Sequence, residues 1–120
     1  MQNHRRLEVC VRARELATQV YAVASTLSGS ERYELARQLR RAAVSVGSNI
    51  AEGCGRATRR DFCSFLDNAL GSATELEFQL DLCERASLAP LPGVREALET
   101  TKRVQQMLTR LIVSIRSADN

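Results

Sequence analysis

Six arginines gather in the middle of the chain, where they could bind phosphate. A guanidinium holds phosphate or carboxylate through a rigid, two-pronged set of N–H donors. Residues 37–60 contain one acid, Glu52, and six bases: Arg37, Arg40, Arg41, Arg56, Arg59 and Arg60. On a nucleic acid, each neutralised phosphate adds to the salt dependence of binding. One interpretation of these six residues is therefore a surface for RNA or DNA.

The alternative is that the same arginines form ion pairs with the following segment. Residues 61–84 carry no basic residue and six acids: Asp61, Asp67, Glu75, Glu77, Asp81 and Glu84. Such complementarity fixes the order of helices or joins subunits. The sequence leaves both interpretations open, and they can hold for different arginines.

A polar run that contains Ser45, Ser48, Asn49 and Glu52 is the one place that resembles a catalytic site. A serine becomes a nucleophile when a neighbouring base takes its proton, and the run contains no His or Lys. Glu52 has no evident second carboxylate. We therefore expect a structural role for these residues, and no catalytic residues and no enzyme activity.

The cysteines and the histidine give no sign of a metal centre. Cys10, Cys54, Cys63 and Cys83 form no C-x-x-C pair, and the single histidine, His4, stands near the N-terminus. Zinc sites need clustered ligands. We expect reduced thiols that act mainly as small apolar residues, with no metal and no cofactor.

The elements that position these residues are four amphipathic helices. Apolar residues recur at three- and four-residue steps in segments of about 7–27, 31–52, 59–86 and 93–116, and no segment alternates as a strand does. Short connections place neighbouring helices antiparallel. The pattern predicts an all-α fold, an antiparallel up-down-up-down four-helix bundle that forms one domain over residues 1–120.

The third segment also carries apolar residues on the side away from its core stripe. Gly71, Phe78 and Leu82 lie on that line. A line of exposed Phe and Leu predicts a partner surface, and we expect it to be an oligomer interface between copies of the chain. The alternative is contact within a splayed monomer.

The chain has no apolar run of about 18 residues, the length that a membrane helix needs. The first ten residues, MQNHRRLEVC, lack the features of a signal peptide. We expect a cytoplasmic protein that does not bind membranes.

Two stretches resemble a known bacterial family. Residues 40–55 read RRAAVSVGSNIAEGCG, and residues 59–83 read RRDFCSFLDNALGSATELEFQLDLC. They resemble the 23S rRNA intervening-sequence protein family, with its motif R-R-A-A-x-S-x-x-x-N-I-A-E-G and a third helix of the form F-x-x-F-L-x-x-A-x-G-S-x-x-E-L-x-x-Q-L. The resemblance covers about residues 7–115.

The resemblance implies a bundle that assembles as a homopentameric ring or barrel. It also implies similarity to the accessory proteins of diversity-generating retroelements, which bind a reverse transcriptase and nucleic acid. The expected function is a non-enzymatic oligomeric scaffold that binds RNA or DNA, alone or beside a nucleic-acid enzyme. The rival expectation is a protein–protein adaptor without nucleic-acid binding.

Overall fold

Four long helices form a rod that measures 50 × 21 × 18 Å. The computed structural model describes residues 2–118, and the side chains of all of these except residues 2, 3 and 31. The helices are α1 (Gln2–Ser25), α2 (Ser30–Cys54), α3 (Arg59–Arg85) and α4 (Leu91–Ala118). The described residues contain no strand. The prediction of an all-α, four-helix fold is confirmed.

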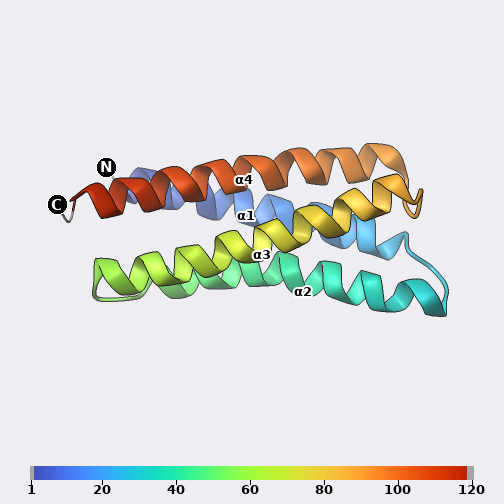
Figure 1. The fold of residues 1–120 in the computed structure, drawn as a ribbon, viewed down its shortest axis with the longest axis horizontal. Coiled ribbons are helices and arrows are strands. Elements are labelled where there is room, and N and C mark those ends of the chain that lie inside the picture. The colour runs from blue at the N-terminus through green and yellow to red at the C-terminus, as the bar shows by residue number, and fades with distance from the viewer. Residues whose placement is uncertain (1, 119–120) are drawn as a thin grey trace.

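The helices stand at the corners of a square. α1 and α3 each pack against α2 and α4, with no packing across either diagonal. Figure 1 shows the α2–α3 loop at the same end of the rod as the start of α1 and the finish of α4. We call this the terminal end. The loops that join α1 to α2 and α3 to α4 lie at the opposite end.

The core runs along the whole rod and is built from the predicted apolar stripes. Every helix contributes fully buried leucine or isoleucine side chains, among them Leu16, Leu39, Leu66 and Leu108. Burying one such side chain contributes about 1.5–3 kcal/mol. Because the stripes repeat at helical spacing, each helix presents one apolar side inward and leaves its charged side in solvent.

The helix ends differ from the predicted ones where local chemistry outweighs the pattern. α4 begins at Leu91, and Pro92 lies in its first turn, where a missing N–H costs nothing. α2 was expected to stop before Gly53 but continues to Cys54. α1 begins at residue 2 rather than 7, so polar residues that lack an apolar stripe extend it.

Candidate nucleic-acid interface

The structure divides the six candidate arginines into two groups. Arg37, Arg40 and Arg41 lie midway along α2, and we call them the central face. Arg56, Arg59 and Arg60 surround the α2–α3 loop at the terminal end, and we call them the terminal cluster. From Arg41 to Cys54, where α2 ends, thirteen residue steps span about 20 Å of helix. The expected single surface is therefore two surfaces.

The central face carries an acid from its own helix. Arg37 donates to both carboxylate oxygens of Glu34, at 2.8 Å from Nη2 and 3.0 Å from Nε. This hydrogen bond lowers the pKa of Glu34 from its ordinary value, and the charge of Arg41 lowers it further. The same bond raises the pKa of Arg37. Both groups are exposed, so the pair adds little to stability.

A groove of about 500 Å³ opens beside the central face. Apolar side chains from two helices contribute to it, since Tyr21 of α1 is 48% exposed and Val44 of α2 is 46% exposed. The lining residues are Tyr21, Arg37, Arg40, Arg41, Val44 and Ser45. The central face thus combines guanidinium groups with uncovered apolar surface.

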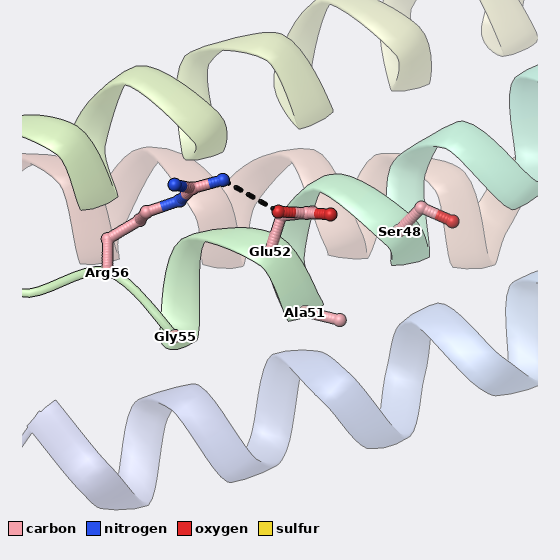
Figure 2. Close-up of a pocket in the computed structure, with 5 residues that line it drawn as sticks. All are labelled: Ser48, Ala51, Glu52, Gly55 and Arg56. Atoms are coloured by element: carbon pink, nitrogen blue, oxygen red, sulfur yellow. Dashed lines mark hydrogen bonds and ion pairs between the residues drawn. The ribbon is translucent and has the colours of Figure 1, made fainter.

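The terminal cluster has a different setting. The Arg56 side chain turns back along α2, where its Nη2 lies 2.8 Å from Glu52 Oε2 (Figure 2). Its guanidinium also lies over the ring of Phe65, 4.6 Å from the centroid. Arg59 Nη1 donates to the backbone oxygen of Ala118 at 3.4 Å. A shallow hollow of about 440 Å³ runs from Ser48 to Arg56 beside this pair.

A second guanidinium–ring contact lies at the same end. Arg6 of α1 stands over the Phe62 ring, 4.3 Å from its centroid. Close packing here depends on Gly53, because a Cβ at this position would lie 2.9 Å from Phe62 Cδ1 and 3.0 Å from Phe65 Cβ. Gly53 therefore serves close packing inside α2 rather than ending the helix. Sequence reasoning missed Arg6, although the antiparallel arrangement that it predicted brings the start of α1 beside the α2–α3 loop.

The predicted pairing of these arginines with α3 acids is wrong for five of the six. Among the described side chains, Arg37, Arg40, Arg41, Arg56 and Arg60 have no carboxylate of α3 within 4.0 Å. Two of the five instead pair with acids of α2, since Arg37 pairs with Glu34 and Arg56 pairs with Glu52.

Four acids of α3 have partners on their own helix or on α4. Arg85 pairs with Asp81 at 2.7 Å, Arg95 with Glu84 at 3.7 Å and Arg116 with Asp67 at 2.7 Å. Glu77 Oε1 accepts from Gln105 Nε2 at 3.0 Å. These ion pairs between helices therefore join α3 to α4 and do not include α2.

The polar run of α2 is joined to α3 by hydrogen bonds. The hydroxyls of Ser45 and Ser72 lie 2.8 Å apart. Asn49 Nδ2 donates to the Ser45 backbone oxygen at 2.8 Å and to the Ser45 hydroxyl at 3.1 Å. These small residues let the two helices approach closely, which is the structural role that the sequence predicts.

The apolar line on the back of α3 is exposed in the single chain. Phe78 is 70% exposed and Leu82 is 40% exposed. A Cβ built on Gly71 would meet no atom within 4 Å. Phe78 is therefore largely uncovered by the rest of the chain, whereas Leu82 is covered in part.

None of the four cysteines forms a disulfide. Cys63 and Cys83 are buried, and Cys10 and Cys54 are half-buried. Burial raises the pKa of Cys54 and of Cys83, so both thiols stay protonated at neutral pH. Within residues 2–118 no cluster of three or more His, Cys, Asp or Glu could hold a metal ion. In the same range no helix is long and apolar enough to cross a membrane.

Comparison with known proteins gives two findings. The sequence model of the 23S rRNA-intervening sequence protein family matches residues 5–110. The fold is similar to the crystal structure of a protein of unknown function from the S23 ribosomal protein family of Bacteroides thetaiotaomicron. That match has a TM-score of 0.82 and 23% identity, and it covers 90% of this chain and 97% of that one, so it concerns the fold. No curated protein sequence matches the chain.

Proposed function

The chain belongs to the 23S rRNA-intervening sequence protein family, and on this premise we propose that it is a non-enzymatic scaffold that self-associates and binds RNA or DNA. In this proposal each copy is an antiparallel up-down-up-down bundle, and five copies form a ring in the cytoplasm. The ring acts alone or beside a nucleic-acid enzyme. The family name supports a link to RNA, and the arginines supply the chemistry.

The exposure of the terminal cluster is the observation that carries nucleic-acid binding. Arg56, Arg59 and Arg60 are all exposed at one end of the rod, and Arg5 is exposed on the adjoining start of α1. A group of guanidinium ions at one end attracts phosphates without reading their sequence. Phe62 is buried and Arg56 covers Phe65, so base stacking on these rings does not enter the proposal.

The proposal assigns no catalytic residue. The Ser45 hydroxyl is engaged by Ser72 and Asn49 rather than by a base. In the hollow of Figure 2, Glu52 is paired with Arg56. Both groups thereby hold the helices and the loop in place.

Fluorescence anisotropy with a labelled single-stranded RNA and a labelled DNA duplex, titrated across a range of salt, tests this function. The variant is R56Q/R59Q/R60Q. Its matched control is R14Q/R95Q/R103Q, which removes the same charge from exposed positions on α1 and α4. We expect the first variant alone to flatten the log–log salt dependence on duplex DNA, by up to about 0.9 for each lost phosphate contact. Equal losses in both variants would contradict a localised site.

A second candidate function is a protein–protein adaptor. Arg37 and Arg56 already have carboxylate partners, since Glu34 pairs with Arg37 and Glu52 pairs with Arg56. Self-association without binding to either nucleic acid at the lowest salt concentration would favour the adaptor.

A further inference from the structure

An acidic groove lies on the side of the rod opposite the central face. It has a volume of about 480 Å³ and lies between α3 and α4. Phe78 stands at its edge and is 70% exposed. The lining residues are Thr74, Glu77, Phe78, Asp81, Glu84, Leu98 and Lys102. Like the central face, this groove combines charge with uncovered apolar surface, but its charge has the opposite sign.

The two grooves belong to opposite sides because of the square arrangement of helices. The groove at the central face is lined from α1 and α2, and the acidic groove is lined from α3 and α4. α1 packs against α2, α3 packs against α4, and neither diagonal pair is in contact. One copy therefore presents its basic side and its acidic side in different directions.

The two grooves also lie at the same height along the rod. The Ser45–Ser72 hydrogen bond places these two residues side by side, and α3 runs back along α2 from there (Figure 1). Phe78 lies six residues after Ser72 on α3. Because α3 and α2 run in opposite directions, Phe78 is level with position 39 of α2, which lies six residues before Ser45. That height lies midway between Arg37 and Arg41.

We propose that the acidic groove of one copy docks onto the central face of the next copy. Phe78 enters the groove between Tyr21 and Val44, and Arg40 and Arg41 face Asp81 and Glu84. This inference deepens the self-association part of the proposed function by naming its two surfaces. It also assigns the central face to assembly and leaves the terminal cluster for nucleic acid.

A second copy fits these surfaces better than a nucleic acid does. The central face has about half-exposed Tyr21 and Val44 beside its arginines, and phosphate gains nothing from covering them. The acidic groove repels phosphate. Its carboxylates have partners in the chain, but the Asp81–Arg85 pair is exposed and the Glu84–Arg95 distance is 3.7 Å. Exposed pairs of this kind are weak and can be exchanged at an interface.

Charge reversal on each face tests the pairing. The variants are R40E/R41E on the central face and D81R/E84R in the acidic groove, each purified as the full chain with its helicity checked by circular dichroism. Light scattering at low salt gives the mass. We expect each variant alone to be a monomer and an equimolar mixture to associate, because each contact between the two different variants joins opposite charges. Two variants cannot alternate around a ring of five, so the mixture should form open or even-numbered oligomers. A variant that assembles alone, or a mixture that stays monomeric, overturns the pairing.

A neutral substitution tests the apolar half of the contact. F78S should shift the mass toward monomer, whereas V113S, which alters an equally exposed apolar residue on α4 (58% exposed), should not. If the wild-type chain is a monomer, the self-association part of the proposed function fails as well. If it assembles but the reversed variants also assemble, only the pairing inferred here fails.

Discussion

The central face and the terminal cluster contain the same residue type but differ in what surrounds it. At the central face, Arg37 holds Glu34 on an open helix surface, beside half-exposed Tyr21 and Val44. At the terminal end, Arg56 lies over Phe65 and Arg6 lies over Phe62, in a region where Gly53 allows close packing. The arginine count is the same in both groups.

The difference teaches that neighbours, rather than charge, decide what a group of arginines can bind. The exposed apolar side chains beside the central face favour binding to another protein surface, because such a surface can bury them. A guanidinium group that already packs on an aromatic ring has less conformational freedom, so it loses less entropy when it binds an anion. Breaking the surroundings of one group should therefore leave the other group intact.

The largest expected effect comes from Gly53. G53A places a Cβ too close to two phenylalanine side chains, at 2.9 Å from Phe62 Cδ1 and 3.0 Å from Phe65 Cβ. We expect a loss of about 1–3 kcal/mol in the free energy of unfolding, measured by urea denaturation. G47A on the same helix meets no atom within 4 Å and should gain about 0.5–1 kcal/mol. Equal effects would show that the terminal end is not tightly packed.

The start of α3 should show the next largest effect. The Thr58 hydroxyl accepts a hydrogen bond from the Asp61 backbone N–H at 3.1 Å and so caps the helix that carries Arg59 and Arg60. T58A should cost about 1 kcal/mol in thermal or urea unfolding. T74A is the control, because Thr74 is exposed inside α3 and alanine is the better helix former. A neutral T58A would mean that the cap does not stabilise α3.

A smaller difference should separate Arg56 from Arg37. R56Q removes a ring contact and an ion pair with Glu52, whereas R37Q removes only the pair with Glu34. An exposed ring contact contributes about 0.5–1 kcal/mol, and a fully exposed ion pair contributes little. R56Q should therefore be the more destabilising variant in urea. The reverse order would place the tighter surroundings at the central face.

The smallest effect is a titration. The Arg37 hydrogen bond is the main cause of the lowered pKa of Glu34, and Arg41 acts through charge alone. Carboxyl NMR should show that R37Q raises this pKa more than R41Q does. The pKa of Glu34 is lower in the folded chain than its ordinary value of 4.5, so the bond with Arg37 stabilises the fold at pH values above 4.5. This stabilisation is lost as the pH falls through the folded pKa of Glu34. Equal shifts in both variants would contradict the observed bond.

The sequence was sufficient for the four helices because their apolar stripes repeat at one spacing. It also identified Phe78 and Leu82 as exposed, since both lie opposite the core stripe of α3. It treated the six arginines as one group because they are close in sequence, but the helix from Arg41 to the end of α2 at Cys54 spans about 20 Å. The role of Gly53 was missed because the pattern alone cannot tell a helix stop from a place where two phenylalanine side chains approach the backbone.

The salt dependence of RNA and DNA binding, compared between R56Q/R59Q/R60Q and R37Q/R40Q/R41Q, tests the division of roles most directly. The two variants lose the same charge from the two groups. We expect the first to flatten the log–log slope and keep its assembled mass, and the second to keep the slope for each subunit and lose mass. A central-face variant that flattens the slope as much as the terminal variant, with its mass unchanged, would contradict the division.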